Sequence, residues 1–527
     1  MLKIPRTVKT IKRRSCKLFY KLFIYFPIDL AVISGNYIKY ASANLKNKIS
    51  GGGKGYKAAG TVSASAPVSP STQVSASAAM PQEFEKRILL IRHDGIGDYI
   101  LCRNFIEILK NSVKFKNYKI SLLGNAAWKE LAEFLDKDFA DGFIWVDRKK
   151  FTSDFVYRYK KIKEITSGSY EVLIHPFSGD FFNADNDLAF LVKAGEKFGS
   201  VKTLPRQRHI KSYKKIILEK IYTGLISDPE GILFEFYKNK NFFEKILGEK
   251  IDIKKPFIKL NPAENKELNS KLGLPALYAA FFIGASVKHR KWPVKNFAET
   301  ARHLKIKYGC ETVLCGGRQE SEDALKFAQY CGEWNVSFIN AVGNISLVDL
   351  LYVIKNASLV VSNETMAPHI AMALSVSPDN SEPMPAHSSG AAIAASFCPH
   401  QERAAFTFNA SDAGGAGTGA YSRSHGVASA QNANAYPHHH AHPAAKAAHP
   451  AVLTISAGED RYGHFSPYPE DISDNYFIVF HPEIANSVEK YIYRAQTAGG
   501  GYDDRFDISG ITVQTVIDKI DEIWRRL

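Results

Sequence analysis

The sequence has few cysteines and no pair of them at the spacing of a metal or redox site. The six, spread over 527 residues, are Cys16, Cys102, Cys310, Cys315, Cys331 and Cys398. Without a Cys-x-x-Cys pair or a zinc spacing, neither a disulfide framework nor a zinc module is expected. Scattered cysteines in a long chain indicate reduced, buried thiols and a cytoplasmic protein.

A long uninterrupted apolar run is also missing. The most apolar stretch, residues 18–33, is broken by Lys21, Pro27 and Asp29, whereas a membrane-spanning helix needs about 20 mostly apolar residues. No small-residue cleavage site closes the run, which disfavours a cleaved signal peptide. A spanning helix is therefore disfavoured, and a helix packed on the body remains an alternative for this stretch.

Acidic residues are scarce in the first fifty positions, where eleven Lys or Arg accompany a single acid, Asp29. The formal net charge is +15, and the remaining sequence is nearly balanced, so no nucleic-acid partner is expected. Basic residues beside aromatic ones favour a segment that lies on anionic lipid. We therefore predict that residues 1–50 form a membrane-surface tail.

Two stretches have the composition of unfolded segments. Residues 51–83 are rich in Gly, Ser, Ala and Pro, which predicts a flexible linker. Residues 377–450 are rich in Ala and His and show no helical or strand period. Joining 371–376 directly to 451–456 gives a helix that passes into a buried strand through a loop of ordinary length. The sequence therefore predicts an insertion at 377–450, disordered and not catalytic.

The rest of the chain alternates short apolar runs with helical patterns, which predicts parallel sheets with right-handed crossovers. Strands are expected at 88–92, 120–124, 143–147, 171–176, 280–284, 312–316, 358–362, 451–455 and 476–480. Helices are expected at 99–111, 126–136, 294–307, 320–331, 346–355 and 367–375, with a last one after the N-cap Thr512. The predicted fold is α/β, with two Rossmann-like lobes facing across a cleft.

The domain boundaries follow from these patterns. Between the linker and the insertion we expect an N-terminal lobe, a connection and the first part of a C-terminal lobe, at residues 84–225, 226–277 and 278–376. After the insertion we expect the second part of the C-terminal lobe and a C-terminal segment with a helix, at residues 451–490 and 491–527.

The first candidate site residues follow the strand at 88–92, where the chain turns through Gly95 and Gly97 into a helix. Such a turn places backbone N–H groups and the carboxylates of Asp94 and Asp98 at one edge of a sheet. Open α/β sheets bind their ligands at that edge. For this motif taken alone, an ordinary strand–helix turn is the alternative.

The strand at 280–284 ends in small residues and is followed by a basic loop. Small residues let the backbone approach a ligand closely, and positive charge beside them suits an anionic leaving group. A solvated basic loop is the alternative interpretation. The residues concerned are Gly284, Ala285, Ser286, Lys288, Arg290 and Lys291.

Two further strand ends carry glycines or polar groups. One is followed by Gly316, Gly317 and Glu320, and the other by Asn363, Glu364, Thr365, Met366 and His369 at the start of a helix. A helix N-terminus can hold a sugar hydroxyl or a phosphate. Helix capping explains Asn363 or Thr365 about as well, and a lone histidine is more often a packing residue. Three strand-end loops of this kind in one half predict an anion site.

In their order and spacing, these motifs resemble glycosyltransferase family 9, the ADP-heptose:lipopolysaccharide heptosyltransferase family. The resemblance extends along residues 86–376 and 451–527, approximately. It rests on 88–98, Gly284–Ser286, Arg290–Pro293, Gly316–Gly317 and Ser362–His369. The family's usual pattern for the last motif is close to Asn-Asp-Ser/Thr-Gly-Pro-x-His. Here Glu364 stands where Asp is common, and Met366 replaces a Gly.

The resemblance implies a GT-B fold and an inverting, metal-independent glycosyltransferase without a cofactor. The N-terminal lobe would bind the acceptor, a lipopolysaccharide or lipooligosaccharide core, with Gly95 and Gly97 on that side. The C-terminal lobe would bind a nucleotide-diphosphate sugar, similar to ADP-heptose. Asp98 matches the family's catalytic base, and Asp94 is the alternative.

The resemblance also implies roles within the donor site. Arg290 matches the family's usual Lys beside the diphosphate, with Lys288 and Lys291 as alternates, and the amides around Thr365 and Met366 would add to it. Glu320 resembles the residue that holds the ribose hydroxyls. The whole predicted donor site comprises Gly284, Ala285, Ser286, Lys288, Arg290, Lys291, Gly316, Gly317, Glu320, Asn363, Glu364, Thr365, Met366 and His369. The protein would act on the inner face of the cytoplasmic membrane, docked by its tail.

Two other functions remain open at this point. A sugar-nucleotide epimerase or hydrolase of the same fold would consume the donor alone. A non-catalytic, lipid-bound scaffold with a degenerate sugar-nucleotide site would accommodate the altered Glu364 and Met366.

Overall fold

A computed structural model of the chain describes residues 85–176, 184–201, 218–229, 233–261, 268, 271–375, 449–458, 465–486 and 507–527. The predicted tail at 1–50, the linker at 51–83 and nearly all of the predicted insertion at 377–450 lie outside these residues. Among the helices of the described ranges, none is long and apolar enough to cross a membrane.

The N-terminal lobe is built on a six-stranded sheet in which every pair of neighbouring strands is parallel. The strands are β1 (Arg87–Arg92), β2 (Lys119–Asn125), β3 (Gly142–Val146), β4 (Tyr170–His175), β5 (Ala194–Val201) and β6 (Gly224–Ser227), in the order β3-β2-β1-β4-β5-β6. In the register, Ile88 lies opposite Ile120 on one side and Val172 on the other. The strand order reverses beside β1, which is where doubly wound sheets leave a crevice for a ligand.

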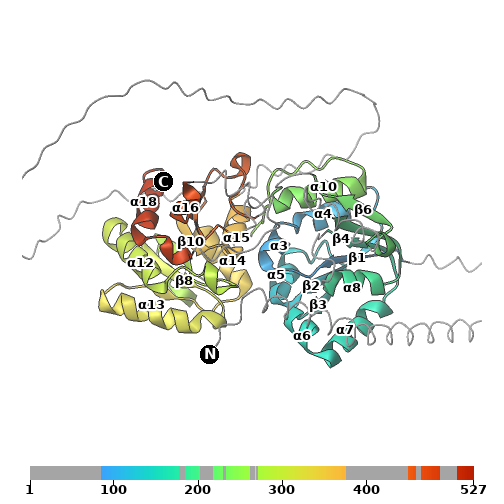
Figure 1. Cartoon of the computed structure of the whole chain (residues 1–527), viewed down its shortest axis with the longest axis horizontal. Coiled ribbons are helices and arrows are strands. Elements are labelled where there is room, and N and C mark those ends of the chain that lie inside the picture. The colour runs from blue at the N-terminus through green and yellow to red at the C-terminus, as the bar shows by residue number, and fades with distance from the viewer. Residues whose placement is uncertain are drawn as a thin grey trace, which may run out of the picture. The chain divides into compact units, whose positions relative to one another are not determined.

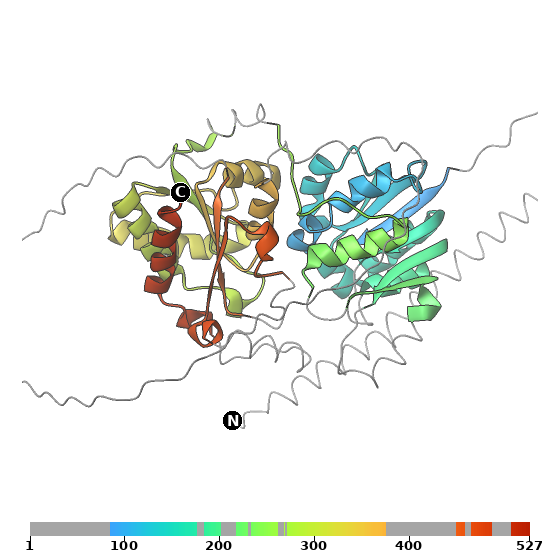
Figure 2. The same ribbon diagram turned by 90° about the horizontal axis from the view of Figure 1, so that it is seen from above.

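Helices cover both faces of this sheet (Figures 1 and 2). They are α3 (Ile96–Ile100), α4 (Asn104–Asn111), α5 (Lys129–Leu135), α6 (Arg148–Ser153), α7 (Phe155–Ser167), α8 (Ala184–Leu191) and α10 (Glu235–Leu247), with the 3₁₀ turn η2 (Ala126–Trp128). The helix predicted at 99–111 is two helices, because the chain turns at residues 101–103. The lobe also extends beyond the predicted boundary at residue 225, since β6 pairs with β5 and Phe236 and Phe243 of α10 pack on Phe105.

The C-terminal lobe contains a second parallel sheet of six strands. Its order is β12-β11-β10-β7-β8-β9, formed by β7 (Tyr278–Phe282), β8 (Glu311–Cys315), β9 (Ile339–Asn340), β10 (Leu359–Asn363), β11 (Ala451–Ser456) and β12 (Tyr476–Phe480). Strand β10 is buried throughout and pairs Leu359 with Ala451. The segments on either side of the predicted insertion are thus a helix and the strand beside β10, as the sequence predicts.

Helices of the C-terminal lobe also pack on both faces of its sheet. They are α12 (Val294–Tyr308), α13 (Ser321–Glu333), α14 (Leu347–Asn356), α15 (Met366–Leu374), α16 (Pro482–Ala485) and α18 (Val513–Trp524), with the 3₁₀ turns η4 (Lys288–Arg290), η5 (Arg318–Glu320), η7 (Glu470–Ile472) and η8 (Ile508–Gly510). Helices α12, α13 and α18 share one apolar cluster, and α14 and α15 belong to another. Thr512 caps α18 by accepting a hydrogen bond from the Thr515 amide at 3.2 Å, which confirms the predicted N-cap.

The two lobes share the apolar cluster of α14 and α15, which also contains Phe105 and Phe236 of the N-terminal lobe. An extended segment after α10 is bonded to both lobes. The amide of Phe257 donates to the Asn104 side chain at 3.0 Å, and the amide of Ile258 donates to the carbonyl of Ala373 at 2.8 Å. The predicted α/β fold of two facing lobes is confirmed.

Candidate active site

The Asp98 carboxylate lies in the turn between β1 and α3. Its Oδ2 accepts a hydrogen bond from the Gly95 amide at 3.1 Å, so it caps the first turn of its own helix. The side chain is half-buried. Two side chains hold the main chain of this turn in place. The carbonyl of Asp94 accepts hydrogen bonds from Asn125 Nδ2 and Trp128 Nε1, at 2.9 Å and 3.1 Å.

A buried arginine lies beneath the turn. Arg92 Nη2 donates to the Asp98 carbonyl at 3.2 Å, and the guanidinium is ion-paired with Asp94 at 3.0 Å and with Glu235 at 3.4 Å. Burial alone would lower the pKa of Arg92, but the two carboxylates raise it above its usual value, so the group stays charged. The Asp94 side chain is therefore buried in this ion pair.

A cavity of about 360 Å³ opens beside Asp98 and is lined by both lobes. The N-terminal lobe supplies the turn from Gly95 to Asp98, and the C-terminal lobe supplies the ends of β7, β8 and β10. The predicted site residues that line it are Gly95, Gly97, Asp98, Gly284, Ala285, Ser286, Arg290, Gly316, Gly317, Glu320, Glu364, Thr365, Met366 and His369. Of the predicted residues, Asp94, Lys288, Lys291 and Asn363 are not among those that line this cavity.

Asn363, at the end of β10, forms hydrogen bonds to the backbone of two neighbouring segments. It is fully buried, and its Nδ2 donates to the carbonyls of Ile283 and Gly284 at 3.0 Å and 3.1 Å. Its Oδ1 accepts a hydrogen bond from the Trp292 amide at 3.0 Å. The amide group thus ties the end of β7 to the basic loop, and its polar atoms are used within the protein.

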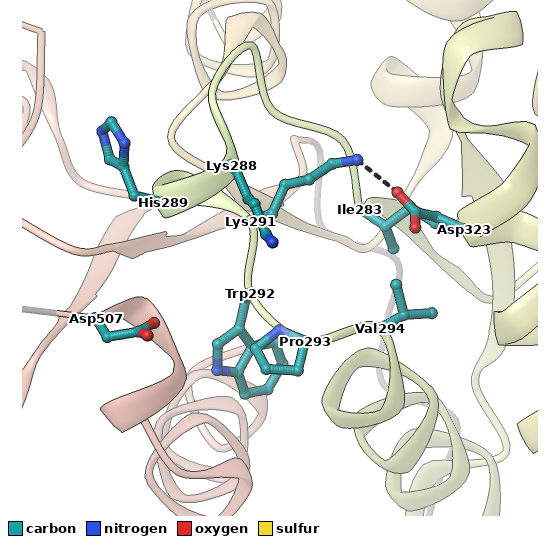
Figure 3. A pocket seen from close by; sticks show the side chains of 9 residues that line it. All are labelled: Ile283, Lys288, His289, Lys291, Trp292, Pro293, Val294, Asp323 and Asp507. Atoms are coloured by element: carbon teal, nitrogen blue, oxygen red, sulfur yellow. Dashed lines mark hydrogen bonds and ion pairs between the residues drawn. The ribbon is translucent and has the colours of Figure 1, made fainter. Parts of the chain in front are cut away.

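The basic loop presents its cations to two different cavities. Arg290 lines the cavity beside Asp98. Lys288 and Lys291 line a neighbouring cavity of about 450 Å³, together with Trp292 and Pro293 (Figure 3). Lys291 Nζ is ion-paired there with Asp323 at 2.5 Å. Of the three cations predicted in this loop, Arg290 is therefore the one that faces the candidate active site.

Glu320 and Gly284 lie in close contact at one end of the cavity. The buried Glu320 side chain accepts a hydrogen bond from the Gly317 amide through Oε2 at 2.9 Å. A Cβ added at Gly284 would be 2.7 Å from Glu320 Oε1, which is closer than real Cβ contacts. The absence of a side chain at Gly284 is thus required for Glu320 to occupy its position.

The start of α15 opens into the same cavity. Thr365 is its N-cap, and the hydroxyl accepts a hydrogen bond from the Ala367 amide at 3.4 Å. Glu364 Oε2 accepts a hydrogen bond from the Ser456 hydroxyl at 3.1 Å, which fixes that carboxylate from β11. A helix N-terminus carries partial positive charge, so this end of the cavity is suited to an anionic group.

His369 connects the two lobes at the cavity. Its Nδ1 is 2.8 Å from the hydroxyl of Tyr468, and burial lowers the pKa of the imidazole to about 4. The ring is therefore neutral at neutral pH. On its other side, the ring contacts the backbone at Gly97, where an added Cβ would be 2.7 Å from His369 Cδ2.

Several cavity residues were not predicted from the sequence. Ile96, Cys315 and Gln319 are direct neighbours of predicted residues, and Phe282 lies two residues before Gly284, so the strand-end positions indicated the right backbone but not these side chains. Phe465 lines the cavity and the Tyr468 hydroxyl is bonded to His369, yet both follow the predicted insertion in a loop without a recognisable motif. Among the described residues, no group of His, Cys, Asp or Glu is arranged to hold a metal ion.

Two parallel α/β sheets that line one cavity define the GT-B class of glycosyltransferase fold. The chain is similar to a solved glycosyl transferase family 9 structure from Veillonella parvula, with a TM-score of 0.53, 15% identity, and coverage of 84% of this chain and 98% of that chain. It is also similar to heptosyltransferase WaaC of E. coli with ADP, with a TM-score of 0.49, 13% identity, and coverage of 83% and 99%.

The sequence comparisons agree with the motifs. A putative glycosyltransferase of Haemophilus influenzae is 23% identical over 304 residues, which are 55% of this chain and 80% of that protein. Residues 237–377 match the model of glycosyltransferase family 9 (heptosyltransferase). The resemblance found in the motifs is therefore confirmed: the chain is similar to members of glycosyltransferase family 9.

Proposed function

We propose that the protein is an inverting glycosyltransferase that moves a heptose-like sugar from a nucleotide-diphosphate sugar, similar to ADP-heptose, to a lipopolysaccharide or lipooligosaccharide core. The observation that carries the proposal is the single cavity that holds Asp98 on one side and Arg290 and the start of α15 on the other. A base and an anion site are thus within reach of one bound donor.

In the proposed reaction, the acceptor hydroxyl lies between Asp98 and the anomeric carbon of the donor. The Asp98 carboxylate takes the hydroxyl proton as the oxygen attacks that carbon. The bond from the anomeric carbon to the diphosphate oxygen breaks on the opposite face, so the configuration inverts. The electron pair and the negative charge leave with the nucleoside diphosphate.

The departing diphosphate needs stabilisation that grows with its charge. Arg290 supplies a cation, and the amides at the start of α15, around Thr365 and Met366, supply N–H donors. These groups perform the task that a divalent cation performs in other transferases, so the proposed reaction is metal-independent. Glu320 is proposed to bind the ribose hydroxyls, and Glu364, held by Ser456, to bind hydroxyls of the transferred sugar.

The acceptor is proposed to bind on the N-terminal lobe, at the turn containing Gly95 and Gly97. This assigns the protein to the inner face of the cytoplasmic membrane, where a lipid-linked core is accessible to a peripheral enzyme. The charge of the first fifty residues supports that location.

A panel of nucleotide-diphosphate sugars incubated with a rough-type lipid acceptor tests the proposal. Mass spectrometry should show one donor whose sugar is added to the lipid, with inverted configuration by NMR. Loss of donor in the absence of acceptor would instead indicate an epimerase or a hydrolase. No binding of any nucleotide sugar in calorimetry would indicate a scaffold and overturn the proposal.

A further inference from the structure

The outer surface formed by α6 and α7 combines exposed apolar and cationic side chains. Val156 and Tyr159 are 64% and 42% exposed, and Lys160 and Lys163 are exposed beside them. Their spacing of three and four residues places all four side chains on one face of α7. The opposite face of the helix buries Ile162 and Ile165 in the lobe. We call this outer face, together with α6, the α6–α7 surface.

The charge of this surface is strongly positive. Residues 148–163 contain seven Lys or Arg and a single acid, Asp154. The Asp154 carboxylate already accepts hydrogen bonds from two amides at the start of α7, and Asp147 does the same at the start of α6. Glu164, just beyond the segment, is ion-paired with Lys161. Lys149 and Lys150 of α6 and Lys160 and Lys163 of α7 are exposed to solvent.

Two other exposed apolar residues have a different environment. Ile306 and Leu325 are 67% and 72% exposed, but the lysines next to them pair with acids. Lys307 bonds Asp521 at 2.6 Å, and Lys326 pairs with Asp323 at 3.9 Å. Single exposed apolar residues in balanced surroundings need no explanation. The α6–α7 surface differs from these two positions in its excess of cations near Val156 and Tyr159.

The surface also has a defined position relative to the candidate active site. Helix α6 starts at the carboxyl end of β3, and the turn of Asp98 starts at the carboxyl end of β1 in the same parallel sheet. Phe151 of α6 packs edge-on against His93, with ring centroids 6.0 Å apart. Figure 1 shows α6 and α7 side by side on this lobe. A flat partner that bound α6 would therefore lie at the sheet edge that also carries the turn of Asp98.

We propose that the α6–α7 surface docks on an anionic phospholipid bilayer. Val156 and the ring of Tyr159 would enter the headgroup region, and the four lysines would contact lipid phosphates. The docking is additional to any contact by residues 1–50, and it brings the acceptor lobe to the membrane that carries a lipid-linked acceptor. The role of this docking in reaching the acceptor rests on the proposed function, whereas the binding of the α6–α7 surface to lipid does not.

Vesicle binding by the full chain tests the proposal. The probes are phosphatidylcholine vesicles with and without phosphatidylglycerol, and binding is measured by sedimentation at low and high salt. Each lysine near an anionic surface contributes about fivefold to binding, so the pair Lys160→Gln/Lys163→Gln should bind anionic vesicles at least tenfold more weakly. The pair Val156→Ser/Tyr159→Ser should weaken binding by about tenfold. The matched control Ile306→Ser/Leu325→Ser should bind like the parent.

A crosslinking experiment identifies what contacts the surface, even where residues 1–50 dominate total binding. With p-benzoylphenylalanine at position 159, illumination on anionic vesicles should give a lipid adduct, and the same group at position 325 should give none. A crosslink from 159 to residues 1–50 of the chain would show that the tail covers the surface and would overturn the proposal. Absence of any lipid adduct, or unchanged binding by both pairs of variants, would also overturn it.

Discussion

Gly97 and His369 are in van der Waals contact across the two lobes of the protein. A Cβ at position 97 would lie 2.7 Å from His369 Cδ2 and 3.3 Å from its Nε2. The turn that carries Asp98 therefore rests directly on the helix that begins the proposed diphosphate site. The contact sets how closely the base approaches the donor, and it explains why residue 97 has no side chain.

Substitution of Gly97 by alanine tests this contact. In an unstrained helix, Gly→Ala stabilises by about 0.5–1 kcal/mol, but here the methyl group must displace His369. We expect a net loss of about 1–3 kcal/mol in the free energy of unfolding, typical of overpacking, together with reduced transfer. Gly332 of α13 is the matched control, since nothing lies within 4 Å of its added Cβ. Gly332→Ala should stabilise slightly, and equal effects of both changes would contradict the contact.

The buried His369 predicts a pH dependence of stability. Burial lowers the pKa of its imidazole to about 4 from an ordinary value of 6.5, so between these values the unfolded chain binds the proton more tightly. Stability is therefore complete above pH 6.5 and falls as the pH drops towards 4, by up to about 3 kcal/mol. His369→Gln should remove this part of the pH dependence. Chemical unfolding of both proteins at several pH values measures it, and parallel curves would contradict the assignment.

Arg290 and Lys288 give a matched pair of cations from one loop. Arg290 lines the cavity beside Asp98, whereas Lys288 lines the neighbouring cavity (Figure 3). Arg290→Gln should lower kcat by about 10²–10³-fold, because the lost charge acts most on the developing negative charge of the leaving group. Lys288→Gln should leave kcat within about twofold. Steady-state kinetics decides, and the reverse order of effects would show that the diphosphate lies on the other side of the loop.

The sequence predicted the strands whose side chains are buried on both faces, because continuous apolar runs are distinctive. Strand β5 was missed because its Gly195, Glu196 and Lys197 interrupt the apolar pattern and are partly or fully exposed. Strands β6 and β9 are four and two residues long, too short for a pattern. They add to sheets whose central strands were already predicted, so the fold class was unaffected.

The candidate site was predictable where it depends on backbone position and less so where it depends on side-chain direction. Glycines and small residues at strand ends indicated the edge that forms the cavity. The sequence could not show that the Asn363 side chain bonds backbone carbonyls, or that Lys288 and Lys291 line a different cavity from Arg290. Asp94 and Asp98 are four residues apart, and the structure distinguishes them because Arg92 holds Asp94 in a buried ion pair whereas Asp98 lines the cavity. Such differences arise from tertiary contacts with distant segments.

The most direct test of the account compares Asp98→Asn with the parent enzyme in a transfer assay, with donor affinity measured by calorimetry on the same samples. We expect transfer to fall by at least about 10²–10⁴-fold, the contribution of a general base, while donor affinity stays unchanged. Asn at position 98 can still accept the hydrogen bond from Gly95, so the turn should persist. Transfer at the parental rate by Asp98→Asn would contradict the central claim that this carboxylate takes the acceptor proton.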